Sequence, residues 1–201
     1  MLTLAFDTAT GVATSALLED GKVLGERVGA TGRLLEDVDE LLAATDAAPS
    51  ELARLVVGTG PGSFTGLRMG LAAGRALALA LSVEVAGVST LDALAAGAPP
   101  ALPVIDARRH EVFTLIGGEP IAIDPQYLDN TLVQGRSCVG DGAIRYRDVL
   151  EAAGAEIPPD DSELHIPRAR VHARLARDFG PAELVEPIYV RVPDADKSLP
   201  A

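Results

Sequence analysis

The sequence predicts an α/β protein of two domains, and three observations carry that prediction. Short strand-like segments alternate with amphipathic helical segments through the first half of the chain. Three prolines between residues 98 and 103 forbid regular structure and mark a domain boundary. Beyond it a strand again ends in aspartate, at Asp106, as the first strand ends at Asp7. We therefore expect domains at residues 1–98 and 103–201.

The first domain is expected to begin with three strands in a meander, at residues 2–6, 13–18 and 22–28. An Asp-Gly pair suits the tight turn between the second and third strands. Leucines and Val38 at helical spacing, with acidic residues opposite, predict a helix over residues 34–42. The remaining elements expected are a strand at 55–57, a loop at 58–66, a helix at 67–81, a strand at 83–87 and a short helix at 91–96 capped by Ser89.

The second domain has a weaker pattern. Strands are expected at 104–106 and 111–116, with a further strand near Ile121. Helices are expected near 142–153 and 167–179. No internal sequence repeat is evident.

Composition excludes several classes of function. The chain has 201 residues, is 48% hydrophobic and carries a net charge of −12, so it does not grip a polyanion by bulk electrostatics. With 3% aromatic residues and no Trp, a base-stacking platform is also excluded. A single cysteine, Cys138, rules out an intramolecular disulfide and fits a reducing compartment. We expect a cytoplasmic protein with no secretory signal and no membrane span.

The most informative stretch is a loop between a strand and a helix, rich in glycine and hydroxyl residues. It suits either an anion- or partner-binding loop or a tight strand-to-helix connection with Ser63 or Thr65 as the N-cap. It lacks the Gly-Lys-Ser/Thr ending of a Walker A loop. The loop consists of Gly60, Pro61, Gly62, Ser63, Phe64, Thr65 and Gly66.

The helix after this loop carries glycine at every fourth position, at Gly66, Gly70 and Gly74. Each glycine destabilises a helix by about 1 kcal/mol relative to alanine, so the stripe calls for a close backbone contact. That contact is either internal packing or a subunit interface, and we favour the interface. Its expected residues, on this helix and the one before it, are Leu34, Leu35, Val38, Leu41, Leu42, Leu67, Arg68, Gly70, Leu71 and Gly74.

Other candidate sites are weaker. The turn containing Asp7, Thr8 and Thr10 suits either phosphate and metal placement or a plain turn. The segment 106–109 resembles it, with a salt-bridged turn as the alternative, and the glycines at 140 and 142 favour a turn over a nucleotide contact. The three histidines lack metal-ligand spacing, so no metal site is expected. One basic patch suits an RNA or acidic-subunit contact, although a solvated face is favoured; it contains Arg168, Arg170, Arg174 and Arg177.

Five segments together resemble the TsaB (YeaZ) family, the dimerisation subunit of the bacterial machinery that makes threonylcarbamoyladenosine (t6A) in tRNA. The resemblance extends over residues 1–115 and returns at 187–191. A histidine often found at the start of the family's first helix is replaced here by Gly32-Arg33, and the chain is short after Leu115. The segments that carry the resemblance are 7–10, 60–68, 87–91, 106–112 and 187–191.

This resemblance implies an actin/Hsp70-like fold of two lobes, each an RNase H-like mixed sheet with helices. It also implies a non-catalytic subunit that pairs with and activates a TsaD-like threonylcarbamoyltransferase, mainly through helices of the first lobe. A TsaE-like ATPase joins the assembly, the isolated subunit forms a homodimer, and tRNA is bound only indirectly. The turn at Asp7, Thr8 and Thr10 would then be a vestigial phosphate turn. No tightly bound cofactor is expected, and nucleotide would enter only in the complex.

The alternative is a stand-alone ATPase or phosphotransferase of the same fold, with Asp7 and Asp106 around a metal-bound nucleotide. It needs a second phosphate loop and an adenosine-binding glycine segment, for which only residues 140–142 are available. A peptidase is disfavoured further, because no nucleophile–base pair stands out.

Overall fold

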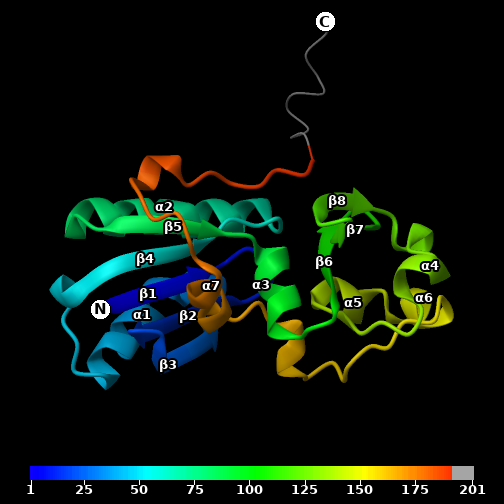
Figure 1. Ribbon diagram of the computed structural model, residues 1–201, viewed down its shortest axis with the longest axis horizontal. Helices are drawn as coiled ribbons and strands as arrows, with labels where there is room; N and C mark the ends of the chain where they lie inside the picture. The colour runs from blue at the N-terminus through cyan, green and yellow to red at the C-terminus, as the bar shows by residue number, and fades with distance from the viewer. Residues whose placement is uncertain (192–201) are drawn as a thin grey trace, which may run out of the picture.

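The computed structural model describes residues 1–191 and shows two lobes side by side (Figure 1). The first lobe holds β1 (Leu2–Asp7), β2 (Ala13–Glu19), β3 (Lys22–Gly29), α1 (Leu34–Ala44), β4 (Leu52–Gly58), α2 (Phe64–Leu81), β5 (Glu84–Val88) and α3 (Thr90–Gly97). The second holds β6 (Leu102–Arg108), β7 (Glu111–Ile116), β8 (Glu119–Ile123), α4 (Asn130–Val133), β9 (Cys138–Val139), α5 (Asp141–Arg145) and α6 (Arg147–Ala152). Then follows α7 (Ala169–Leu175).

The two sheets share one strand order. In the first lobe the order is β3-β2-β1-β4-β5, with an antiparallel meander on one side of β1 and parallel strands on the other. In the second lobe the order is β8-β7-β6-β9, so β6 occupies the place of β1. The second lobe therefore repeats the first lobe's topology with its last strand missing. This repeat is invisible in the sequence except in the aspartates near the ends of the two central strands.

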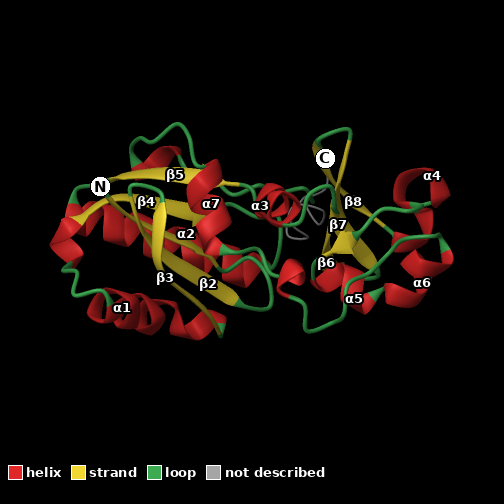
Figure 2. Ribbon diagram, turned by 60° about the horizontal axis from the view of Figure 1, so that its bottom comes forward, coloured by secondary structure: helices red, strands yellow, loops and turns green. Residues whose placement is uncertain are grey.

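Helices cover both faces of the first sheet (Figure 2). On one face α1 and α2 pack over an aliphatic cluster that includes Phe6, Leu17 and Leu55. On the other face α3 and α7 pack over a cluster of small residues, among them Ala5, Ala16 and Ala86. The small side chains let these helices approach the sheet closely. The core is aliphatic, as the low aromatic content requires.

One helix, α3, serves both lobes. Its leucines Leu91 and Leu94 lie in a cluster with Ile105, Phe113 and Val139 of the second sheet. The opposite face of that sheet is covered by α4, α5 and α6. In Figures 1 and 2 α3 accordingly stands between the lobes. The prolines at 99, 100 and 103 stand where the chain passes from this helix into β6.

The predicted second domain, 103–201, is wrong in its final part. Helix α7 packs on β1, β2 and β4 of the first lobe, and Val185 lies in the first lobe's core. A buried hydrogen bond from Thr14 Oγ1 to the carbonyl oxygen of Pro167, 2.8 Å long, fixes the start of this return. The first lobe therefore contains two separate stretches of chain. Predictions that fall within residues 192–201 lie outside the described residues.

Smaller differences from the predicted elements have local causes. The helix expected at 67–81 begins at Phe64, because the Ser63 hydroxyl accepts a hydrogen bond from the Gly66 N–H as an N-cap. The helix expected at 142–153 is interrupted at Tyr146 and forms α5 and α6. The helix expected at 167–179 is confined to α7. The two short elements α4 (Asn130–Val133) and β9 (Cys138–Val139) have too few residues to show periodicity, so the sequence does not predict them.

Candidate functional site

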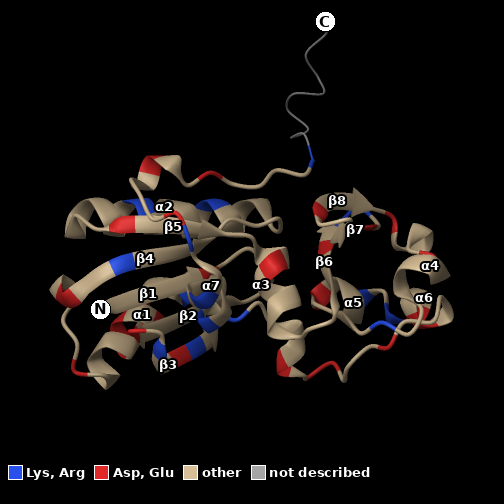
Figure 3. Ribbon diagram, viewed as in Figure 1, with Lys and Arg blue, Asp and Glu red and all other residues tan. Residues whose placement is uncertain are grey.

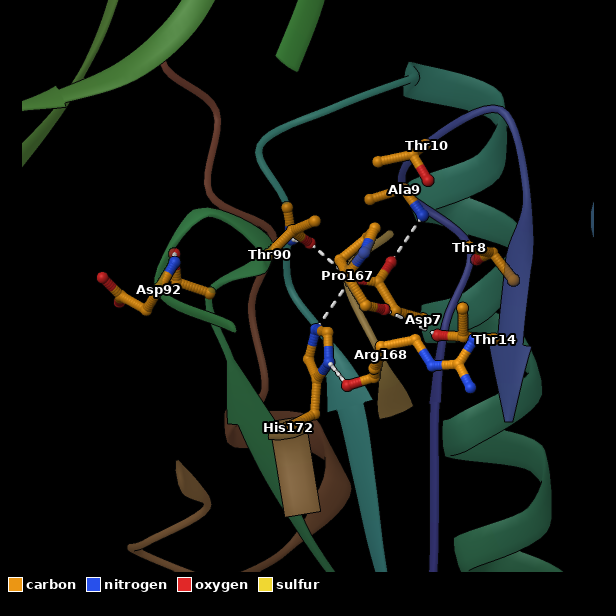
Figure 4. A network of polar contacts seen from close by, with 12 residues as sticks. Asp7, Thr8, Ala9, Thr10, Thr14, Thr90, Asp92, Pro167, Arg168 and His172 are labelled. Atoms are coloured by element: carbon orange, nitrogen blue, oxygen red, sulfur yellow. Dashed lines mark hydrogen bonds and ion pairs between the residues drawn. The ribbon is translucent and has the colours of Figure 1, made fainter. Parts of the chain in front are cut away.

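The turn after β1 is built around a buried carboxylate, that of Asp7 (Figure 4). Its Oδ1 accepts a hydrogen bond from the Ala9 N–H (2.6 Å), and its Oδ2 accepts one from the Thr90 hydroxyl (2.6 Å). Nε2 of His172, on α7, lies 2.8 Å from the same Oδ2. Asp7 and His172 are both buried. The Asp7 carboxylate, the Thr90 hydroxyl and the His172 imidazole thus form one polar network in the interior of the first lobe.

The charge of Asp7 is balanced within the chain. Burial raises the pKa of this carboxyl, but the ion pair with His172 and the hydrogen bonds from Thr90 and Ala9 outweigh burial and hold it below its ordinary value. The other ring nitrogen of His172, Nδ1, lies 3.1 Å from the carbonyl oxygen of Arg168. Because both neighbours are hydrogen-bond acceptors, the imidazole satisfies them together when both nitrogens carry protons. The pair is then an imidazolium facing a carboxylate.

The glycine-rich loop is tied to this turn. The Gly60 N–H donates to Thr90 Oγ1 (3.1 Å), and the Ser63 N–H donates to the carbonyl oxygen of Ala9 (2.6 Å). The Thr8 hydroxyl donates to the carbonyl oxygen of Gly66 (2.7 Å). These groups are engaged inside the lobe. The geometry therefore favours the tight strand-to-helix connection over a loop of free N–H groups for an anion.

The second lobe has a counterpart of Asp7 in Asp106. Its Oδ1 accepts a hydrogen bond from the N–H two residues on, at Arg108 (2.9 Å), as Asp7 does from Ala9. Its Oδ2 lies 3.1 Å from the Arg108 guanidinium and 3.7 Å from that of Arg145. The salt-bridged turn weighed from the sequence is what forms. The Asp106 N–H donates to Asp141 Oδ1 at 2.9 Å, which joins the turn to the start of α5.

The glycines of 140 and 142 serve packing in the second lobe. Gly140 has φ of +116°, and a Cβ there would lie 2.3 Å from the carbonyl oxygen of Val104. A Cβ at Gly142 would lie 2.7 Å from the carbonyl carbon of Ile105. Both glycines let α5 begin directly against β6. The turn favoured from the sequence is therefore the structural role.

Between the two aspartate turns lies a cleft of about 700 Å³. Its first-lobe wall is the loop 61–67 with Thr10 and Gly11, and its second-lobe wall is the segment 105–109 with Asp141. The third wall is formed by residues 188–191. Among residues 1–191, no three side chains of the metal-ligating types gather into a site. The cleft is large enough for a small molecule, but the carboxylate of Asp7 is not exposed to it.

The comparisons with known proteins agree on one family. A family model described as TsaD, tRNA N6-adenosine threonylcarbamoyltransferase, matches residues 31–151. The tRNA threonylcarbamoyladenosine biosynthesis protein TsaB of Bacillus subtilis is 36% identical over 123 residues, which are 57% of this chain and 54% of that protein. The solved structure of YeaZ from Pseudomonas aeruginosa matches with a TM-score of 0.75 at 26% identity, over 94% of this chain and 99% of that one. The chain belongs to the TsaB (YeaZ) family.

Coverage differs between these relatives. An uncharacterized protein of Mycobacterium leprae is 42% identical over 56% of this chain but only 34% of its own length. The chain thus spans about a third to about a half of the first curated relatives it matches. More distant solved structures match with TM-scores of 0.51 and 0.54 at 11% and 14% identity, which shows the fold alone. With the repeated strand order, these matches confirm the actin/Hsp70-like class with two RNase H-like lobes.

Most of the interface residues expected from the family resemblance and the glycine stripe lie in this chain's own core. A Cβ on Gly70 would lie 2.4 Å from Thr8 Oγ1, and one on Gly74 would lie 2.6 Å from Val57 Cγ2, so the stripe packs on the first sheet. The prediction that the glycine side of α2 meets a partner is wrong, because its glycines admit the lobe's own strands. The other buried members of the expected set are Leu34, Val38, Leu41, Leu42, Leu67 and Leu71.

Two members of the expected set are on the surface, Leu35 and Arg68. Leu35 is 59% exposed on α1. The guanidinium of Arg68 lies 3.8 Å from the centre of the Phe64 ring, and its Nε donates to the Tyr189 hydroxyl at 3.3 Å. The outer side of α2 also carries Leu79, which is 82% exposed. A family interface on these helices would therefore use their outer sides.

Two arginines of the basic patch are engaged in contacts within the chain; Figure 3 shows the basic residues in blue. Arg168 and Arg170 both form ion pairs with Glu26 of β3, whose side chain is 7% exposed. Arg177 donates to the carbonyl oxygens of Arg174 and Ala176. The expectation of a solvated face is wrong for Arg168, which is mostly buried, because this arginine fastens α7 to the first sheet.

Sequence reasoning missed His172 as the partner of Asp7. The two residues are 165 positions apart, and the histidine lies in the stretch assigned to the other domain. One signal was available. His172 stands between Val171 and Ala173 in a short helical segment, and this apolar setting favours burial. A buried imidazole requires polar partners, so a partner such as a carboxylate was to be sought.

Proposed function

We propose that the chain is a non-catalytic subunit of the t6A machinery that binds and activates a TsaD-like threonylcarbamoyltransferase. Relatives named tRNA threonylcarbamoyladenosine biosynthesis protein TsaB support a role in t6A biosynthesis. The match of the TsaD family model to residues 31–151 supports descent from a common ancestor with that enzyme. Two homologous two-lobed proteins are well suited to pair through equivalent helices.

The observation that carries this proposal is the outer side of α2. The inner side of the helix is buried against the sheet. The outer side carries two exposed arginines, Arg68 and Arg75, but its other exposed residues beyond Arg68 are apolar: Ala72, Ala76, Leu79 and Ala80. A surface helix normally presents polar residues outward. By length and composition α2 also passes as a membrane span, a test that core helices of soluble proteins pass as well. We assign its outer side, with Leu35 of α1, to the partner.

The two aspartate turns favour a non-catalytic role over the stand-alone ATPase. A nucleotide-bound metal needs a carboxylate oxygen free to face the cleft. Asp7 is enclosed by His172 and Thr90, and Asp106 is paired with Arg108. The residues present therefore do not fit a metal–nucleotide. We propose that the subunit holds no tightly bound cofactor and meets nucleotide only within the complex.

The remaining assignments follow from this role. We propose that the isolated subunit forms a homodimer through the same outer side of α2, so that homodimer and partner compete for one surface. A TsaE-like ATPase would join the assembled pair. With a net charge of −12 the subunit meets tRNA only through its partner. The proposed location is the cytoplasm.

The test is a charge placed on the outer side of α2. Leu79→Asp introduces a carboxylate where the proposed interface is apolar. Burying a leucine contributes about 2 kcal/mol, so its loss alone weakens binding about 30-fold, and the unpaired charge weakens it further. Because Leu79 is 82% exposed, the variant keeps its fold. Binding to the TsaD-like protein of the same organism is measured by calorimetry, with t6A formation as the second readout.

Leu164→Asp is the matched control, since Leu164 is 42% exposed in a turn that packs on α3 and α5. We expect this control to bind the partner as the wild type does. Equal affinity of Leu79→Asp and wild type would overturn the proposed interface.

A separate experiment tests the alternative of a stand-alone ATPase. We expect calorimetry with ATP and Mg²⁺ on the isolated chain to show no binding, because the carboxylates are engaged. Tight magnesium-dependent binding would overturn the non-catalytic assignment and restore the alternative.

A further inference from the structure

The segment at residues 187–191 was part of the sequence resemblance, and the proposed interface gives it no role. In Figure 1 it follows the first lobe above α2 and then passes toward the second lobe. It has no helix or strand of its own. It also forms one wall of the cleft, from Ile188 to Arg191.

The segment is anchored on the first lobe by Tyr189 and Ile188. The Tyr189 ring lies 6.0 Å from the Phe64 ring, and its hydroxyl accepts the hydrogen bond from Arg68 Nε. The Ile188 N–H donates to the carbonyl oxygen of Thr59 at 2.8 Å. These contacts fix the segment to the start of α2 and the end of β4.

The next two residues are anchored on the second lobe. Val190 packs against the apolar cluster that contains Phe113. Arg191 donates to the carbonyl oxygen of Ala107 at 3.2 Å and forms an ion pair with Glu111 of β7. The Arg191 guanidinium also lies 5.9 Å from the centre of the Phe113 ring. Within two residues the chain therefore changes its partner from one lobe to the other.

The chain also passes between the lobes on the side away from residues 187–191. The chain passes from α3 to β6 and returns from residue 165 to α7, and in Figure 1 both passages lie below the level at which residues 187–191 cross. Connections on one side of two lobes form a hinge, and opening about a hinge separates the opposite side most. A contact at that opposite side resists opening with the greatest leverage.

We propose that residues 187–191 are a strap that sets the angle between the two lobes and so the width of the cleft, with Tyr189 and Arg191 as its anchors. The strap works without a ligand or a partner, because its contacts are within the chain. Loss of either anchor leaves both lobes folded and allows them to separate. The proposal goes beyond the partner surface, since it concerns the lobes of the isolated subunit.

The test measures the distance between the lobes by double electron–electron resonance. Spin labels are placed at Ala53→Cys on β4 and Glu119→Cys on β8, two exposed positions that lie off the outer side of α2. The labelled protein is mixed with an excess of unlabelled protein, so that only distances within one subunit are measured. The native Cys138 does not compete for label, because it is fully buried and burial raises the pKa of its thiol to about 11. The wild-type strap is expected to give one narrow distance distribution.

Removing an anchor is expected to shift this distribution to longer distances and to broaden it. Arg191→Ala removes the second-lobe anchor and Tyr189→Ala the first, whereas Tyr189→Phe keeps the ring contact with Phe64 and is expected to have the smaller effect. Arg177→Ala is the matched control, because Arg177 bonds only to carbonyl oxygens of its own turn and should leave the distribution unchanged.

Circular dichroism identifies variants that fail to fold. Should Arg191→Ala be one of them, Glu111→Gln removes the charge partner of Arg191 without deleting side-chain volume, and it is expected to broaden the distribution in the same direction. An unchanged distance distribution in the folded anchor variants would show that residues 187–191 merely lie on the surface, and the strap would be refuted.

Discussion

The two lobes are built on one plan but differ in how each neutralises its aspartate. In the first lobe Asp7 is enclosed, and its partner is a buried histidine from the returning helix α7. In the second lobe Asp106 is paired with Arg108, whose side chain is 76% exposed. The first arrangement depends on a residue 165 positions away, whereas the nearest charged partner in the second lies two residues along the same turn. The same topology thus supports one long-range and one local solution.

The difference follows from the return of helix α7 to the first lobe. This helix packs on β1, β2 and β4 and encloses the end of the first sheet's central strand. A carboxylate at the end of that strand therefore needs a buried partner. In the second lobe the turn lines the cleft, and solvent reaches the pair from the side of Arg108, since the Asp106 side chain itself is only 7% exposed. The following substitutions test this contrast.

The largest effect is expected from His172→Ala. It leaves the Asp7 carboxylate buried without its charge partner, which destabilises a protein by about 3–5 kcal/mol. Urea denaturation followed by circular dichroism measures the loss. A loss below about 1 kcal/mol would mean that Thr90 and the Ala9 N–H suffice for Asp7 and that the enclosure does not matter.

A somewhat smaller effect is expected from Gly66→Ala. The new Cβ would lie 2.1 Å from the Thr8 carbonyl oxygen, and such overpacking destabilises by about 1–3 kcal/mol. Gly32→Ala is the matched control, because nothing lies within 4 Å of its Cβ position, and it should leave the unfolding midpoint in place. If both variants unfold alike, the glycine stripe is not held against the sheet.

These two residues also show how far the sequence carries. The strand meander, the amphipathic helix α1 and the Ser63 cap follow from local patterns, because periodicity and capping act within a few residues. The glycine stripe correctly indicated a close contact. Its target could not be predicted, since strands and partner chains both offer a backbone for close approach. The same holds for His172, whose role depends on the return of α7 to the first lobe.

The lobes should also respond to pH with opposite signs. The pKa of Asp7 is lowered in the fold, so its contribution to stability is present above about pH 4 and is lost as pH falls through the lower folded value. Burial raises the pKa of Asp141, so the ionised form opposes folding as pH rises above about 4. Asp7→Asn should therefore lower the free energy of unfolding at pH 7. Asp141→Asn should raise it, because the amide oxygen can still accept the hydrogen bond from the Asp106 N–H.

Urea denaturation at pH 7 and pH 4 measures both variants. The difference between Asp141→Asn and wild type should shrink at the lower pH, where the wild-type carboxyl takes up its proton. A loss of stability in Asp141→Asn at pH 7 would mean that the negative charge of Asp141 itself supports the turn.

The smallest effect is expected from Arg145→Ala in the second lobe. Arg145 lies 3.7 Å from Asp106 Oδ2, its side chain is 56% exposed, and Arg108 pairs with the same oxygen from a shorter distance. The Asp106 side chain is 7% exposed, but solvent around the exposed guanidinium screens its attraction to the carboxylate, and ordering the long Arg145 side chain costs entropy. The unfolding midpoint should equal that of the wild type in low and high salt. A salt-dependent loss comparable to that of His172→Ala would show that Asp106 needs a cation as strictly as Asp7 does. The two aspartates would then differ only in the geometry of their partners and not in their need for a cation.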